Sequence, residues 1–192
     1  MASHFAISSV GESLMTRLRN AYPAALRTRF PCSFQVLSTQ QLSERNVLRP
    51  TTLALFLYRV TVNEHLRGAR RSADPSDEAI PLALDLHWML CVVADSATAE
   101  HTILAWAMKE LHANPVLDAA SLTPEGGWSP GEVVQLIPAE LSNEDLMRIW
   151  DAVTPPYHLS VSYVTRVVRI ELEPLHGRPV VATRLAVQDQ VP

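Results

Sequence analysis

The stretch from residue 82 to residue 94 restricts the fold more than any other part of the sequence. It is apolar almost throughout, and only Asp85 and His87 in it are strongly polar. In a strand the side chains would alternate between two faces: Leu82, Leu84, Leu86, Trp88, Leu90 and Val92 on one, and Ala83, Asp85, His87, Met89, Cys91 and Val93 on the other. A strand that is apolar on nearly both faces belongs in the middle of a covered sheet.

A helix is expected directly after this strand, over residues 97–113. Its apolar residues recur at the spacing of one helical face, which suits a helix lying on a sheet; they are Ile103, Leu104, Ala107, Met108 and Leu111. Ser96 or Thr98 can cap the helix N-terminus, and the pair Asn114-Pro115 ends it. The strand and this helix together form the expected core.

The rest of the chain predicts further elements of both kinds. Helices are expected over 6–20 and 142–152, the second with Ser142 as its N-cap, and strands over 33–37, 52–63, 133–137 and 159–172. Alternation along the last strand places Arg166, Val168 and Ile170 on the face of Ser162 and Val164. The stretches 64–79 and 115–131 are expected to be loops. The first joins two long strands without an obvious helix, which favours hairpin-like antiparallel pairing.

These elements predict an α+β fold, with a mixed, largely antiparallel sheet of about four strands and helices packed against it. The 192 residues, 47% of them hydrophobic, suit one globular domain. We expect that domain over residues 1–173 and a C-terminal tail over residues 174–192. Residues 180–187 of the tail alternate weakly, and they would either add an edge strand or dock on another subunit.

Charge is divided unevenly along the chain. Residues 1–71 carry ten Arg, no Lys and three Glu, a formal charge of +7, whereas the remainder carries six basic and 17 acidic residues, a charge of −11. Such asymmetry is typical of nucleic-acid binding, or of one surface that meets the opposite surface of a neighbouring copy. The basic half has no nucleic-acid motif and few aromatic residues for stacking on bases, so we favour the second interpretation.

Composition also predicts a location for the protein. No apolar run reaches the roughly 18 residues that cross a bilayer, and the first residues lack the basic and apolar regions of a secretion signal. We therefore expect a protein that stays in the cytosol where it is made. The two cysteines, Cys32 and Cys91, have no zinc-type spacing and are expected to be buried free thiols.

The titratable residues do not form a recognisable catalytic motif. Asp85 and His87 share one strand face and could reach one pocket, but an acid–base or metal site would need a further partner. Glu100, His101 and His112 lie on the expected helix without the spacing of a zinc protease. The sequence has no phosphate-binding loop, no dinucleotide fingerprint and no nucleophile elbow. We therefore expect a protein that is not an enzyme and has no cofactor and no metal.

Several segments, taken in order, resemble one known family from about residue 7 to residue 172. They are Tyr58-Arg59-Val60, Asn63, Leu66-Arg67, Pro81-Leu82-Ala83-Leu84-Asp85-Leu86, His101-Thr102-Ile103-Leu104, Ala107-Met108, Leu111-His112, Pro115-Val116-Leu117, Leu141-Ser142, Glu144-Asp145-Leu146, Arg148-Ile149-Trp150, Tyr157, Ser160-Val161-Ser162-Tyr163 and Arg166-Val167-Val168. Together they resemble the cap, or tube-terminator, proteins of extracellular contractile injection systems. These systems are phage-tail-like particles and include the Photorhabdus virulence cassettes and the antifeeding prophage.

The resemblance implies a structural protein with a tail-terminator-like fold. Such a protein is expected to form a ring, a hexamer, on the end of the inner tube, to stop tube polymerisation and to anchor the last sheath layer. Its partners would be copies of itself, the inner tube protein and the sheath protein, with no nucleic acid and no membrane. Assembly is expected in the bacterial cytoplasm, and the finished phage-tail-like particle would be released.

Two other functions fit the same residues. The first is a phage tail terminator or a baseplate adaptor, which belongs to the same kind of machine. The second, from another class, is a small-ligand-binding or hydrolytic domain that uses Asp85 and His87.

For the cap function we hypothesise a contact with a neighbouring subunit or with the tube. The residues expected to make it come from the second strand and the loop that follows it: Arg59, Asn63, Arg67, Arg70 and Arg71. The competing interpretation is that Arg59 and Asn63 satisfy local backbone groups and that the loop arginines are solvated.

Overall fold

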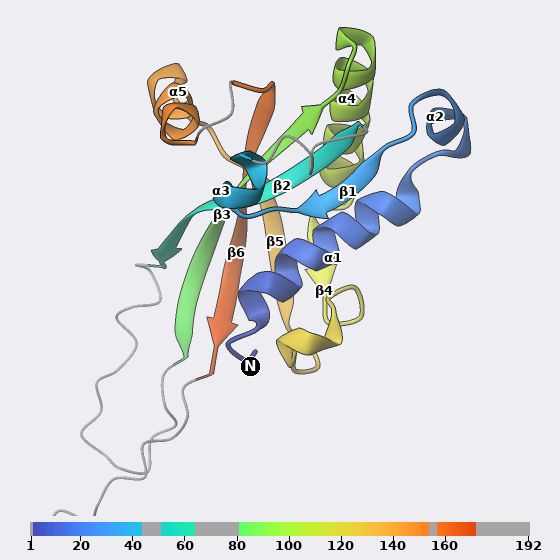
Figure 1. Cartoon of the computed structure of the whole chain (residues 1–192). Helices are drawn as coiled ribbons and strands as arrows, with labels where there is room; N and C mark the ends of the chain where they lie inside the picture. The colour runs from blue at the N-terminus through green and yellow to red at the C-terminus, as the bar shows by residue number, and fades with distance from the viewer. Residues whose placement is uncertain (1, 44–50, 64–80, 154–156, 172–192) are drawn as a thin grey trace, which may run out of the picture.

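The computed structural model describes residues 2–43, 51–63, 81–153 and 157–171, and their strands form one six-stranded sheet (Figure 1). The strands are β1 (Ser33–Val36), β2 (Thr52–Val62), β3 (Leu82–Val93), β4 (Val116–Asp118), β5 (Val133–Pro138) and β6 (Ser160–Ile170), in the spatial order β1-β2-β3-β6-β5-β4. The predicted α+β class is confirmed, but the sheet has six strands where about four were expected.

Among the strands that the structure describes, one neighbouring pair is parallel. β1 runs parallel to β2, and every other neighbouring pair is antiparallel, including β2 with β3. The mixed, largely antiparallel sheet and the hairpin-like β2–β3 pairing are therefore as predicted. β4 lies in the stretch that the sequence predicted to be a loop. Its three residues are too few to show alternation, and their pairing with β5 makes them a strand.

Five α-helices and a short 3₁₀ helix are found among the described residues. They are α1 (Ala6–Ala21), α2 (Ala24–Arg29), α3 (Thr39–Ser43), α4 (Ala97–Ala113), α5 (Asn143–Ala152) and the 3₁₀ helix η2 (Pro124–Gly126). The bounds of α1, α4 and α5 agree with the prediction to within one residue. Ser96 and not Thr98 caps α4, because the Ser96 side chain accepts a hydrogen bond from the Ala99 backbone N–H. Ser142 caps α5 in the same way.

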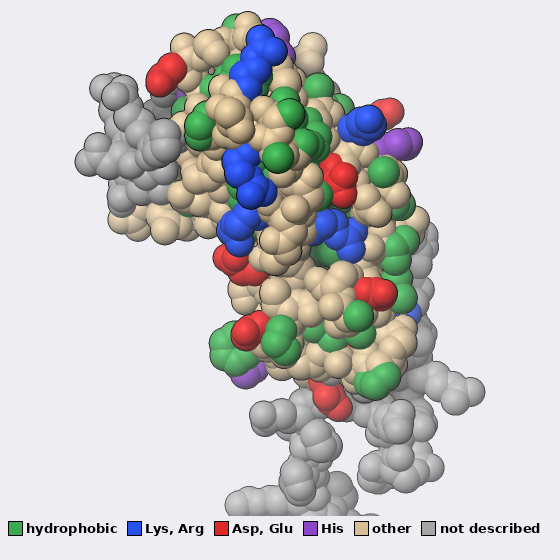
Figure 2. Space-filling view, turned by 90° about the vertical axis from the view of Figure 1, so that its right-hand side faces the viewer, with side chains coloured by type: hydrophobic (Ala, Val, Ile, Leu, Met, Phe, Trp, Pro, Cys, Tyr) green, Lys and Arg blue, Asp and Glu red, His purple; other side chains and the backbone are tan. Residues whose placement is uncertain are grey.

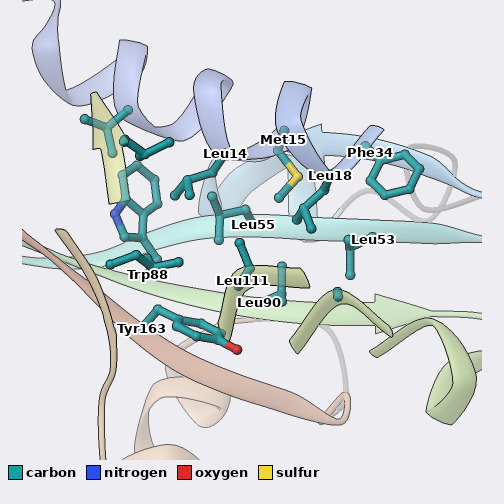
Figure 3. Packing of buried hydrophobic residues seen from close by; sticks show 14 of the residues in the cluster. Leu14, Met15, Leu18, Phe34, Leu53, Leu55, Trp88, Leu90, Leu111 and Tyr163 are labelled. Atoms are coloured by element: carbon teal, nitrogen blue, oxygen red, sulfur yellow. The ribbon is translucent and has the colours of Figure 1, made fainter. Parts of the chain in front are cut away.

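The larger hydrophobic cluster lies between one face of the sheet and the helices α1 and α4 (Figure 3). β3 contributes its even-numbered residues from Leu84 to Val92, as its alternation predicted. The apolar stripe of α1, with Val10, Leu14 and Leu18, is buried on them. Gly11 permits this close approach, because an added Cβ would lie 2.9 Å from the Trp88 ring.

The opposite face of the sheet carries a second, smaller cluster under α3 and α5. Met89 and Cys91 of β3 lie there with Phe56 of β2 and Trp150 of α5. The rings of Phe56 and Trp150 meet edge to face, with centroids 5.8 Å apart. Both faces of the central strand are thus covered, as its composition predicted.

A bulge in β2 changes which face its side chains occupy. Leu57 pairs with Trp88 and Arg59 pairs with His87, so Tyr58 is an extra residue in β2. As a result Arg59 points to the face of α5, the face on which His87 lies.

A second irregularity lies between β3 and β6. Leu84 pairs with Val168 and Leu86 pairs with Thr165, so two residues of β6 stand opposite Asp85 alone. Val168 is therefore buried in the same cluster as Tyr163, and Ile170 packs against that cluster. The prediction that Val168 and Ile170 share a face with Ser162 is wrong, because simple alternation does not continue through a bulge.

Both cysteines are free thiols, as expected. Cys91 is buried, and its burial raises the pKa of its thiol to about 12, whereas Cys32 is only half-buried. No helix in the described part of the chain is both long and apolar enough to cross a bilayer.

Candidate functional site

A group of polar side chains lies on the α5 face of the sheet, at the end of β2, β3 and β6 where β2 finishes. We call it the polar cluster; its members are Arg59, Thr61, Asn63, Asp85, His87 and Arg166, which with Val62 line a hollow of about 290 Å³. The two bulges bring the cluster together. They turn Arg59 toward His87 and place Arg166 opposite Asp85.

Asp85 is the centre of the polar cluster and is 7% exposed. Its two carboxylate oxygens accept hydrogen bonds from the Asn63 side-chain amide, at 3.1 and 3.2 Å. The Arg166 Nε lies 3.4 Å from the same carboxylate, which gives this buried acid an opposite charge. The Asn63 Oδ1 is buried and accepts no hydrogen bond from the described residues.

His87 lies beside this carboxylate and bonds to a different neighbour. Its Nε2 is 3.0 Å from the Thr61 hydroxyl, and its ring meets the Tyr58 ring with centroids 5.9 Å apart. Desolvation by burial lowers the pKa of His87, the nearby Arg59 lowers it further, and the Asp85 charge opposes both effects. The imidazole is therefore neutral at pH 7 and cannot balance a negative charge.

A second hollow of about 330 Å³ continues from the first and shares Arg59, His87 and Arg166 with it. Its other wall is the chain leading into α5, including Pro138 and Glu140. The Arg59 side chain is exposed and makes no hydrogen bond or ion pair with another described residue. The arrangement can therefore offer guanidinium donors to an acidic or carbonyl group of another molecule.

The structure places some of the predicted site residues and does not describe others. Arg59 and Asn63 are brought together with Asp85 and His87 in the polar cluster, while Arg67, Arg70 and Arg71 lie outside the described residues. The polar residues of α4 do not join this cluster, because α4 packs on the opposite face of the sheet. In the described ranges no three His, Cys, Asp or Glu residues gather so that they could hold a metal ion.

Sequence reasoning missed three residues of this region. Thr61 and Arg166 belong to the polar cluster, and the Tyr58 hydroxyl lies beside it, 2.9 Å from the Ser162 hydroxyl. Alternation along the last strand did place Arg166 on the face of Ser162. The missing signal was the pairing of β6 with β3, which the sequence alone does not give.

The chain is similar to solved structures, and its sequence matches one family model. No curated protein matches the sequence. The fold is similar to that of the sheath/tube terminator of the extracellular contractile injection system PVC in its extended state. The TM-score is 0.56 and the identity 18%, over 96% of this chain and 64% of that one. The chain thus spans less than two thirds of the terminator's length.

A second similar structure is the tube-terminating cap of the anti-feeding prophage. Its TM-score is 0.48 and its identity 14%, over 94% of this chain and 60% of that chain. At the level of sequence families, the model described as the Pvc16 N-terminal domain matches residues 9–183, which is most of the chain. The chain therefore belongs to the Pvc16 N-terminal domain family.

Proposed function

We propose that this protein is a structural cap that terminates the inner tube of a contractile injection system. The family match over residues 9–183 carries the proposal, and the fold shared with a sheath/tube terminator agrees with it. In this function six copies form a ring on the tube end, stop the addition of tube subunits and hold the last layer of sheath. The protein transforms no substrate, and assembly takes place in the bacterial cytoplasm.

The physical basis of such a cap is geometric. An open tube end presents unpaired surfaces that keep recruiting subunits. A ring that matches the tube on one side and offers no matching surface on the other side ends this growth. The partners of this chain are therefore further copies of itself, the inner tube protein and the sheath protein.

The polar cluster supplies a candidate contact within this function. Arg59 is exposed and, among the described residues, unpaired, so it is suited to reach a neighbouring subunit or the tube. Asn63 is 8% exposed and its amide donates to Asp85, so its part is to hold Asp85 in place. We retain Arg67, Arg70 and Arg71 in the same proposed contact on the grounds of charge and proximity in sequence.

The proposed function is tested by particle assembly with and without the gene. Negative-stain images of particles made without it should show tubes of irregular length and uncapped ends. Complementation with the wild-type gene should restore a uniform length. Particles of normal length with capped ends in its absence would reject the function.

The proposed contact is tested separately in the complemented strain. Arg59→Glu, and the triple charge reversal of Arg67, Arg70 and Arg71, should each reduce the fraction of capped particles. Lys109→Glu on α4 is the matched control for Arg59→Glu, because it makes the same charge change on the other face of the sheet. If both variants cap as well as the control, the contact is rejected while the function stands.

A further inference from the structure

Two surfaces of opposite charge lie on opposite sides of the sheet. Helices α1 and α2 carry one acidic residue, Glu12, against Arg17, Arg19, Arg27 and Arg29, a formal charge of +3. Residues 140–152, which include α5, carry one basic residue, Arg148, against Glu140, Glu144, Asp145 and Asp151, a charge of −3. α1 packs on the face that contains Trp88, and α5 packs on the face that contains Met89.

The positive side has a hollow that is suited to an anionic group. Figure 2, which looks onto the side of the molecule where α1 and α2 lie, shows several Lys and Arg side chains close together. Between these helices and β1 lies a hollow of about 520 Å³, and no carboxylate from the described part of the chain lines it; the lining residues are Arg19, Asn20, Tyr22, Arg27, Cys32 and Phe34. We call α1 and α2 with this hollow the basic surface.

The two arginines of this hollow are held in place by the backbone. The Arg19 Nη2 donates to the Phe34 carbonyl at 2.9 Å, and the Arg27 Nη2 donates to the Tyr22 carbonyl at 3.2 Å. A guanidinium has five N–H donors, so each side chain keeps most of its donors for a ligand. Because the backbone bond already restricts the rotamers of each side chain, binding a ligand costs less conformational entropy. Such preorganisation favours binding of carboxylates.

The titratable groups in the hollow do not cancel its charge. Burial raises the pKa of Tyr22 to about 12, and burial also raises the pKa of the Cys32 thiol to about 11. Both groups therefore stay neutral at pH 7, and among the described lining residues the net charge comes from the two arginines.

The negative side has carboxylates that are free to bind and apolar groups beside them. Glu140 and Asp151 are exposed and form no ion pair with the described residues, whereas Glu144 is paired with Arg148 at 2.6 Å. Met147 of α5 is 42% exposed, and Tyr157, which follows in the chain, is 45% exposed. We call residues 140–152 the acidic surface. Exposed apolar groups next to charges are the usual composition of a protein contact.

We propose that the basic surface of one copy binds the acidic surface of the next copy, with carboxylates entering the hollow between Arg19 and Arg27. A second copy is the fitting partner because one chain carries both surfaces with equal and opposite formal charge. Their placement on opposite sides of the sheet gives a head-to-tail contact, which forms a ring when the rotation from one copy to the next closes. The proposal deepens the cap function, since it names the contact that closes the ring, and it rests on that function.

A polyanion is the alternative occupant of the basic surface. Nucleic acid would use the arginines of the basic surface but would leave the acidic surface without a function. A contact between copies uses both surfaces, so reversing either charge should weaken the contact and reversing both should restore it.

The test uses the full chain and three charge variants. The first is Arg19→Glu with Arg27→Glu, the second is Glu140→Lys with Asp151→Lys, and the third combines all four substitutions. Lys109→Glu with Arg169→Glu is the control, because it makes the same net change as the first variant at exposed positions on other elements. Self-association is measured by sedimentation velocity, and folding of each variant is checked by thermal unfolding.

The first and second variants should each weaken self-association by at least about tenfold, and the combined variant should recover most of it. The control should associate like the wild type. If Arg19→Glu with Arg27→Glu fails to fold, the second variant still tests the proposal, because Glu140 and Asp151 are exposed and their side chains form no hydrogen bond or ion pair with the described residues. Unchanged association of either folded variant, or a combined variant no better than the single-surface ones, overturns the proposal.

Two further results separate this proposal from the others. The first result is binding of a short RNA. If the wild type binds the RNA, the first variant alone loses this binding, and self-association of that variant is unchanged, the basic surface belongs to nucleic acid and the proposal is overturned. The second result comes from particle assembly. If deletion of the gene lengthens the tubes, and complementation with the first or second variant still caps them normally, this contact is rejected and the cap function stands.

Discussion

At the scale of single residues, the indole of Trp88 is held both by packing and by a hydrogen bond. It is almost fully buried between α1 and the sheet, and its N–H donates to the hydroxyl of the buried Thr165 at 3.1 Å. A buried donor left without an acceptor costs more free energy than the hydrogen bond itself contributes. The hydrogen bond between Trp88 and Thr165 therefore stabilises the pairing of β3 with β6, in addition to the packing of their side chains.

Thr165→Val should lower the free energy of unfolding by about 1–3 kcal/mol, because it leaves the Trp88 N–H without an acceptor. Denaturant unfolding monitored by fluorescence measures the change. In a Trp88→Phe background the same substitution should cost much less, since no donor is left unsatisfied. Equal costs in both backgrounds would show that the hydrogen bond is not the reason.

A second residue-scale prediction concerns pH. The pKa of His87 is lowered from its ordinary value of 6.5, so the unfolded chain takes up a proton on this residue before the folded protein does. Above pH 6.5 His87 is neutral in both states, and its full contribution to the free energy of unfolding is present. As the pH falls from 6.5 through the lowered pKa of the folded state, this contribution is lost. His87→Gln should therefore flatten the fall of unfolding free energy below pH 6.5, measured by denaturant unfolding across that range.

His101→Gln on α4 is the matched control for this pH series, because His101 is an exposed histidine away from the polar cluster. It shows how far the loss of any one histidine changes the pH series, so an effect confined to His87→Gln belongs to the polar cluster. A steeper fall in His87→Gln than in the wild type would contradict the lowered pKa.

At the scale of elements, the long periodic segments could be predicted from sequence and the short or irregular ones could not. The stripes of α1 and α4 and the two apolar faces of β3 follow from side-chain periodicity alone. α2, α3 and β4 have three to six residues each, fewer than a pattern needs. Regular alternation from Leu53 to Asn63 would place Arg59 and Asn63 on the face of α1, and only the bulge at Tyr58 turns them to the other face.

The candidate site was predicted in part for the same reason. Asp85 and His87 could be placed on one face from their spacing in β3. Thr61 and Arg166 join them because of strand pairing, which depends on contacts between segments far apart in the chain.

The cap of α4 gives a test at this scale. Ser96→Ala removes the side-chain acceptor of the Ala99 N–H and should lower the free energy of unfolding by about 1 kcal/mol. Thr98→Ala, two residues later on the exposed side of the first turn, should change it by less than about 0.5 kcal/mol. Thermal or denaturant unfolding measures both, and an equal loss in the two variants would mean that the cap is not the cause.

At the scale of the whole molecule, the distribution of charge matters more than its net value. The net charge is −4, yet the basic and acidic surfaces lie on opposite sides of one sheet. Contact between copies through these surfaces should depend on ionic strength, because exposed charges are screened over about 10 Å at 0.1 M salt and about 3 Å at 1 M.

Raising NaCl from about 0.1 M to about 1 M should therefore shift the wild type toward smaller species in sedimentation velocity. The variant that reverses both surfaces should respond in the same way, since its charges are again complementary. Association that strengthens with salt would indicate an apolar contact between copies.

The bulge at Tyr58 has a consequence for how the lengths of related chains can vary. A relative that lacks this one residue would keep Arg59, Thr61 and Asn63 beside His87 and Asp85, because the strand would return to regular alternation at that point. A deletion at Leu55 instead would move the side chains of one part of β2, either before or after the deletion, to the opposite face of the sheet. Alignments that tolerate a deletion in β2 should therefore place it at the bulge, and a gap elsewhere in this strand would mark a relative whose polar cluster has been lost or rebuilt.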